Sequence, residues 1–119
     1  MTEEYDLAKQ TVVRFIDLNE VLADLRGAVA EAKAAHPEIV RVLLFGSLVR
    51  GNWTADSDAD LMVVVETDFP DFLTSRTPYQ ILAKSIPIDS LVYSTGEFEK
   101  LRSDASTFLA QNLLNAIEL

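Results

Sequence analysis

The sequence predicts a mixed α/β (α+β) domain, in which helices pack against a small mixed β-sheet, and three observations support this class. Apolar residues recur at helical spacing between residues 18 and 36. Short apolar runs at 39–45, 58–65 and 87–93 are typical of strands, and a second helical pattern fills 104–117. Such an order of elements is typical of a sheet covered by helices.

The first helix has the clearest pattern of all the elements. Asp17 or Asn19 can cap its start, and Pro37 ends it at residues 35–36. Residues 1–16 suggest one additional turn or short helix. The apolar face of the main helix is expected to contain Leu18, Val21, Leu22, Leu25, Val29 and Ala32.

The three strands differ in how deeply we expect them to be buried. Residues 39–45 are β-branched and aliphatic and end at a Gly-Ser pair, which indicates a buried strand. Residues 58–65 are apolar on both faces beyond Leu61, which places this strand in the middle of the sheet. Residues 87–93 form the third strand.

The segments between the strands are expected to be short. One helical turn is predicted at residues 48–50, and Gly51 ends it. Residues 67–77 are predicted to form a loop. Residues 78–85 predict a short helix and 96–101 a helical turn. The closing helix over 104–117 would carry Leu109, Leu113 and Ile117 on one stripe.

Length and composition indicate a single domain over residues 1–119. The chain has no cysteine and one histidine, His36. Disulfide frameworks, thiolate zinc sites, iron–sulfur clusters and cysteine nucleophiles are therefore excluded. The lack of cysteine and an acidic start without the basic region of a signal peptide predict a cytoplasmic protein.

The charge balance restricts the partners. Ten Lys and Arg residues face nineteen Asp and Glu residues, for a net charge of −9. We therefore expect no broad nucleic-acid binding, which needs a basic face, and no anionic membrane surface as a partner. The longest apolar runs are too short to span a bilayer.

The segment 43–65 carries the most informative pattern. Its first strand ends at Gly46-Ser47, where a helical turn begins. A glycine lets a ligand approach the backbone closely, and the free N–H groups at a helix start attract phosphate. The Ser47 hydroxyl adds a donor, and Arg50 can reach a phosphate or hold an acidic loop. The alternative is a tight turn with a capping serine.

Three aspartates form the second part of the pattern. Asp58 and Asp60 share one face of their strand because side chains i and i+2 point the same way. Asp89 interrupts an apolar strand and would join them if the two strands are neighbours. Three carboxylates beside a phosphate favour two Mg²⁺ ions, or Mn²⁺. The alternatives are a solvated strand edge or an Asx turn for Asp58 and Asp60, and an exposed strand position for Asp89.

Together these motifs resemble the nucleotidyltransferases of the DNA polymerase beta superfamily. Gly46-Ser47, Arg50-Gly51 and the stretch 57–61 fit the family pattern GS-x-x-RG followed by SD-x-DL. The short length resembles the minimal nucleotidyltransferase (MNT) branch, whose members often act as antitoxins of a HEPN-type toxin. The resemblance implies the nucleotidyltransferase fold, with the motif in 43–65 and the third carboxylate in 87–93.

The resemblance also implies a role for each residue. Gly46 and Ser47 would hold the phosphates of ATP, and Arg50 would contact phosphate or an acidic acceptor surface. Asp58 and Asp60 would bind the metals. Asp89 would complete the site and help to deprotonate the acceptor hydroxyl.

The implied reaction transfers AMP from ATP to a hydroxyl group of a partner protein, a tyrosine of the HEPN-type toxin in the antitoxin branch. Two alternatives remain open. The chain can be a non-catalytic, nucleotide-binding antitoxin that neutralises its partner by forming a complex. It can also be a small-molecule nucleotidyltransferase that needs a second chain to build the acceptor pocket. Trp53 either stacks on a base or anchors its own loop.

Overall fold

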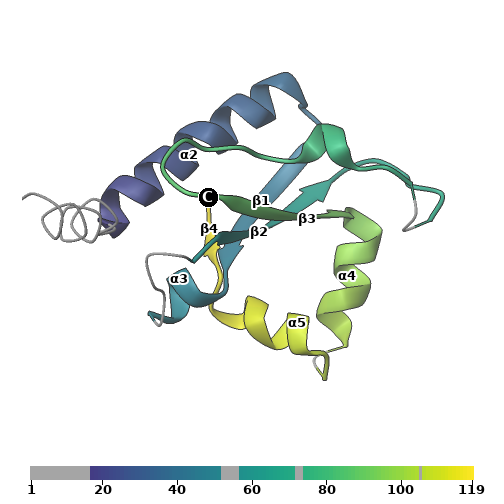
Figure 1. Cartoon of the computed structure of the whole chain (residues 1–119). Coiled ribbons are helices and arrows are strands. Elements are labelled where there is room, and N and C mark those ends of the chain that lie inside the picture. The colour runs from purple at the N-terminus through teal and green to yellow at the C-terminus, as the bar shows by residue number, and fades with distance from the viewer. Residues whose placement is uncertain (1–16, 52–56, 72–73, 105) are drawn as a thin grey trace, which may run out of the picture.

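The fold is a four-stranded mixed sheet with helices on both faces (Figure 1). In this computed structural model the strand order is β3-β2-β1-β4. β2 pairs antiparallel with β1 and parallel with β3, and β4 is antiparallel to β1. The strands span Ile39–Phe45 (β1), Ala59–Val65 (β2), Ile88–Ser94 (β3) and Ile117–Glu118 (β4). The predicted α/β class is confirmed. The structure describes residues 17–51, 57–71, 74–104 and 106–119.

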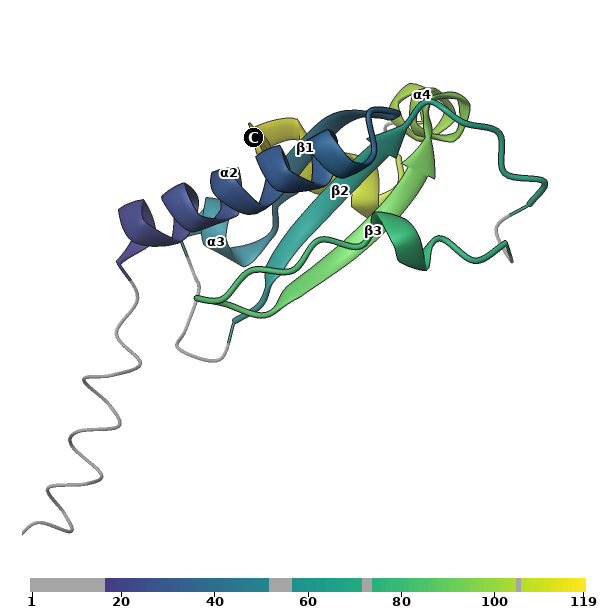
Figure 2. The same cartoon turned by 90° about the horizontal axis from the view of Figure 1, so that it is seen from above.

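One face of the sheet is covered by helix α2, Leu18–Ala35 (Figures 1 and 2). The carboxylate of Asp17 accepts hydrogen bonds from the backbone N–H groups of Asn19 and Glu20, so it caps the helix start as predicted. The helix ends two residues before Pro37, because a residue preceding proline avoids the helical region. The predicted turn in residues 1–16 lies outside the described residues.

β2 lies in the middle of the sheet and is buried on both faces, as predicted from its sequence. Leu61 and Val63 pack on the side of α2, whereas Met62 and Val64 pack on the opposite side. That side is covered by α4 (Thr95–Ser103) and α5 (Phe108–Asn112). Leucine, methionine and valine on both sides explain the uninterrupted apolar run of this strand.

The short helix predicted for residues 78–85 is wrong. Only a 3-10 turn, η1 (Thr77–Tyr79), forms there, and the following chain runs without helix or strand to β3. Ile81 and Ile86 are both buried in the core on the α2 side. The backbone N–H and the hydroxyl of Ser85 donate to the carboxylate of Asp24 on α2. Tertiary contacts therefore override the local helical preference.

The closing helix predicted for residues 104–117 is also wrong as a single element. It is divided into α5, a 3-10 turn η2 (Leu113–Asn115) and strand β4. The Thr107 hydroxyl accepts from the N–H of Ala110, so the helix begins late. Ile117 pairs with Leu44 of β1 instead of extending the helical stripe.

The predicted turn at 96–101 forms the longer helix α4, which begins at a capping box between Ser94 and Glu97. Helix α3, Ser47–Arg50, is the predicted turn that ends at Gly51. Within the described part of the chain, none of the helices has both the length and the apolarity that a bilayer crossing requires.

Candidate nucleotide site

The sheet topology brings the sequence motifs to one end of the sheet. Because β1 is antiparallel to β2 and β3 is parallel to it, the end of β1 lies beside the starts of β2 and β3. In the register, Phe45 is opposite Asp60, and Asp60 is opposite Asp89. Gly46 directly follows Phe45. Residues far apart in the sequence therefore meet at this end. The condition on which the placement of Asp89 depended, that the second and third strands are neighbours, is met.

The carboxylates act on one another electrostatically. Ala59 points into the core and is fully buried, so Asp60 points to the opposite side, where α5 lies. Desolvation by burial raises the pKa of Asp60, and the charges of Asp89 and Asp58 raise it further. Arg50 lowers it in part. A cation near Asp60 would remove this repulsion.

The three carboxylates do not yet form a ready-made ligand cluster. Among the residues that the structure describes, no three His, Cys, Asp or Glu side chains are close enough together to hold a metal ion. Asp58 and Asp89 are exposed, whereas Asp60 is half-buried. Exposed side chains change rotamer readily, so these two can turn towards Asp60. The oxygen-only donor set is of the kind that Mg²⁺ prefers.

Gly46 occupies a position that only glycine can fill. Its φ of 87° and ψ of −152° lie in a region that is essentially restricted to glycine. A Cβ atom at this position would overlap the Asp60 carboxylate. Ser47 and Arg50 are the first and last residues of α3. The Gly46 backbone therefore lies so close to the Asp60 carboxylate that the position excludes a side chain even when no ligand is bound.

A cavity of about 260 Å³ lies between this end of the sheet and α5. It is lined by Gly46, Arg50, Asp60, Asp89, Phe108 and Asn112, among others, but not by Ser47 or Asp58. Arg50 donates a hydrogen bond of 2.6 Å to the side-chain oxygen of Asn112. Four of the six predicted site residues therefore share one cavity.

Sequence reasoning missed the contribution of α5 to this cavity. Phe108 and Asn112 are four residues apart and lie on one line of the helix, next to the stripe that packs under the sheet. Their i, i+4 spacing was the available signal. It was hidden because the apolar stripe of this segment favoured a core helix, with an acceptor surface as the alternative.

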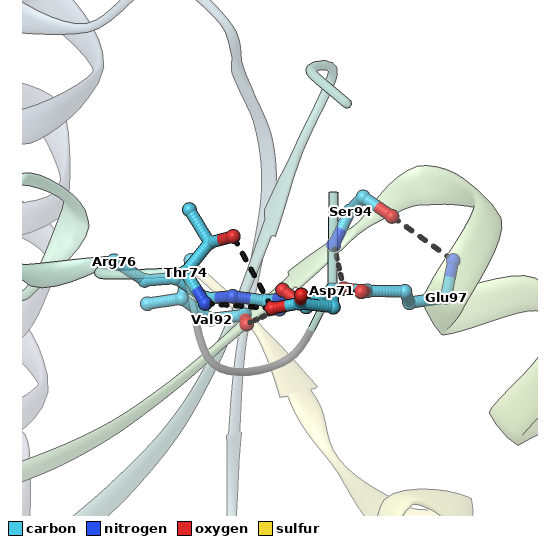
Figure 3. A network of polar contacts seen from close by, with 6 residues as sticks. All are labelled: Asp71, Thr74, Arg76, Val92, Ser94 and Glu97. Carbon is cyan, nitrogen blue, oxygen red and sulfur yellow. Dashed lines mark hydrogen bonds and ion pairs between the residues drawn. The ribbon is translucent and has the colours of Figure 1, made fainter. Parts of the chain in front are cut away.

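A second polar cluster lies where β2 and β3 end, at Val65 and Ser94, whereas the carboxylates lie where these strands begin. Figure 3 shows the residues of this cluster. Arg76 forms a bidentate ion pair with Glu97, at 2.7 and 2.9 Å, and donates to the backbone carbonyls of Val92 and Asp71. Glu97 also accepts from the N–H of Ser94. This network attaches the loop after β2 to the start of α4.

A larger cavity, of about 610 Å³, adjoins that network. Its walls include Phe69, Tyr93, Lys100 and Leu101, and none of the six predicted site residues. The larger cavity and the predicted site residues therefore lie at opposite ends of the sheet. Trp53, for which two roles remained open, lies outside the described residues.

Known proteins resemble this chain in sequence and in fold. The sequence pattern of the nucleotidyltransferase domain matches residues 25–116. A Methanocaldococcus jannaschii protein named "putative protein adenylyltransferase" is 34% identical over 62 residues, which are 52% of this chain and 61% of that protein. The chain thus spans less than two thirds of this curated relative.

The fold has a counterpart among solved structures. A Sulfolobus solfataricus protein, described as a "putative nucleotidyltransferase", superposes with a TM-score of 0.54 at 19% identity. The match covers 85% of this chain and 80% of the other. The arrangement of sheet and helices is therefore shared, although the sequences have diverged widely.

Proposed function

Because the chain belongs to the nucleotidyltransferase domain family, we propose that it transfers AMP from ATP to a hydroxyl group of a partner protein, with Mg²⁺ as cofactor. The observation that carries this proposal is the register between Asp60 and Asp89 beside Gly46. Two facing carboxylates next to a closely approaching backbone suit a metal-bound triphosphate. The name of the M. jannaschii relative supports a protein as the acceptor.

In the proposed reaction the acceptor hydroxyl oxygen bonds to the α-phosphorus of ATP. The bond from that phosphorus to the oxygen bridging to the β-phosphate breaks, and pyrophosphate leaves. Asp89 would accept the hydroxyl proton, Asp58 and Asp60 would hold Mg²⁺, and Gly46, Ser47 and Arg50 would bind phosphate. Alignment of the reactants and neutralisation of their charge are the chemistry that bound Mg²⁺ supplies.

The physiological role we propose is that of a cytoplasmic antitoxin that modifies a tyrosine of a HEPN-type toxin. Its support is the resemblance to the minimal nucleotidyltransferases. The net charge of −9 agrees with a protein acceptor better than with a nucleic acid. A cysteine-free chain agrees with the cytoplasm.

A second candidate is a non-catalytic antitoxin that binds nucleotide and neutralises its partner by forming a complex. The observation that favours it is that, in the described part of the chain, the three carboxylates are not gathered into a metal cluster. This candidate predicts that aspartate variants still neutralise the partner.

Intact mass spectrometry tests both candidates. The protein is incubated with MgATP and a HEPN-type protein, in parallel with the Asp58→Ala/Asp60→Ala double variant. We expect an AMP-sized mass gain on the partner with the wild-type protein only. Transfer by the double variant would refute the metal site. A stable complex of both versions with the partner, and no mass gain, would favour the non-catalytic antitoxin.

A further inference from the structure

The cavity at the carboxylates is too small for a whole nucleotide. Its volume is about 260 Å³, whereas pockets that enclose drug-sized ligands measure roughly 300–1,000 Å³. If the triphosphate lies beside Asp60 and Asp89, the nucleoside must extend to the rim. The chemistry of the rim therefore determines how the base is held.

Phe108 forms part of this rim and has no role in the core. Its side chain is 83% exposed, although it begins helix α5 and lines the cavity. The neighbouring Leu109 and Ala110 face the sheet side of the helix and contact or fill the core there. Leaving a phenylalanine in water forgoes the stabilisation that burial of its ring would provide. A ligand that covers the ring would recover part of this free energy.

The backbone that carries this ring is also fixed relative to helix α3. Asn112, one turn after Phe108, accepts the 2.6 Å hydrogen bond from Arg50 of α3. Its side-chain N–H₂ group donates to the carbonyl of Phe108 at 3.2 Å. One side chain thus ties the first turn of α5 to α3. The backbone position of Phe108 is thereby coupled to the helix that follows Gly46.

We propose that Phe108 is the base-stacking platform of this site, against which the planar base of the bound nucleotide lies. This inference rests on the proposed function for the position of the triphosphate. Among the described residues, the other exposed large apolar side chains are Val40, Leu82 and Leu114. None of these is aromatic, and none lines this cavity. Because every base has a π-face, stacking here tolerates different bases.

Calorimetric titration with two ligands tests the platform. We measure the Kd of MgATP and of Mg-tripolyphosphate, which lacks a base, for the wild type and for Phe108→Ala, Phe108→Leu and Phe108→Trp. Loss of one stacked base weakens binding by roughly 5- to 150-fold, which corresponds to about 1–3 kcal/mol. We expect this loss for MgATP with the alanine and leucine variants, an unchanged Kd for tripolyphosphate, and near-normal binding by the tryptophan variant.

Leu82→Ala is the matched control, because Leu82 is 84% exposed and lies away from the cavity. It should change neither Kd. The proposal is overturned if Phe108→Ala binds MgATP as tightly as the wild type. If the KM for the acceptor rises in that case, the ring contacts the acceptor and not the base. An equal loss for both ligands overturns it as well, because it indicates a damaged cavity. Wild-type protein that stacks ATP but transfers no AMP would refute the proposed function alone.

Discussion

Substitution of Gly46 by alanine is the sharpest perturbation of the site that the structure offers. At the φ and ψ of Gly46, a residue with a Cβ costs about 1–3 kcal/mol in backbone strain. For a domain of this size, that lowers the Tm by about 4–12 °C. The new methyl group also overlaps the Asp60 carboxylate, which must rotate away. Because a misplacement of about 1 Å at a reacting centre can reduce the rate 100-fold, we expect AMP transfer to fall by about that factor.

Gly51→Ala separates the two effects. Gly51 also has a positive φ, 83°, but a Cβ there meets no atom within 4 Å. The variant loses about 1–2 kcal/mol from the left-handed backbone, while Asp60 keeps its position. Thermal unfolding and the initial rate of transfer are measured for both variants. If Gly46→Ala transfers AMP as fast as Gly51→Ala, the contact between Gly46 and Asp60 has no part in the reaction and the reasoning fails.

Three further predictions concern stability and are measured by thermal or urea unfolding. Gly27 is exposed inside α2 with free space around it, so Gly27→Ala should stabilise the protein by about 0.5–1 kcal/mol; a lower Tm would contradict this. Hydrogen bonds from Arg76 lower the pKa of Glu97, so the part-buried ion pair stabilises the fold above the ordinary carboxylate pKa, and this stabilisation is lost on acidification. Glu97→Gln should therefore cost about 1.5–3 kcal/mol at pH 7 and flatten the acid limb of the stability profile. The pKa of Asp60 is raised, so the fold loses stability as the pH rises through that pKa and the carboxyl group ionises. Without metal, Asp60→Asn should therefore be at least as stable as the wild type. Mg²⁺ should raise the Tm of the wild type but not that of the variant.

The sequence predicted the elements whose signals are local or continuous. The cap at Asp17, the stop before Pro37 and the apolar run of β2 each identify an element on their own, and all three are confirmed. It failed at residues 78–85 and 104–117, where tertiary contacts decide. Ile81 is buried without a helix, and Ile117 leaves the helical stripe to pair with β1. No helical periodicity reveals a partner strand that is more than seventy residues away.

The same division applies to the site. The apolar pattern of β2 placed Asp60 on a central strand, but the neighbouring position of Asp89 depended on a strand order that only the structure provides. The wall that Phe108 and Asn112 form could not be predicted, because it depends on where α5 begins and how it lies under the sheet. Spacing within a strand is fixed by the backbone, whereas the position of a covering helix depends on packing.

The two aspartates of the candidate site lie outside the hydrophobic core, and this determines how their variants can be interpreted. β2 is the most buried strand, yet Asp58 precedes it and is exposed, and Asp60 is the one residue in it that is not buried. The core beside them is made by Ala59 and Leu61, which point the other way. Removing the two carboxylates therefore leaves the packing of the sheet unchanged and relieves repulsion with Asp89. Loss of AMP transfer in a double variant with an unchanged or higher Tm would thus report the loss of the reaction chemistry and not of the fold.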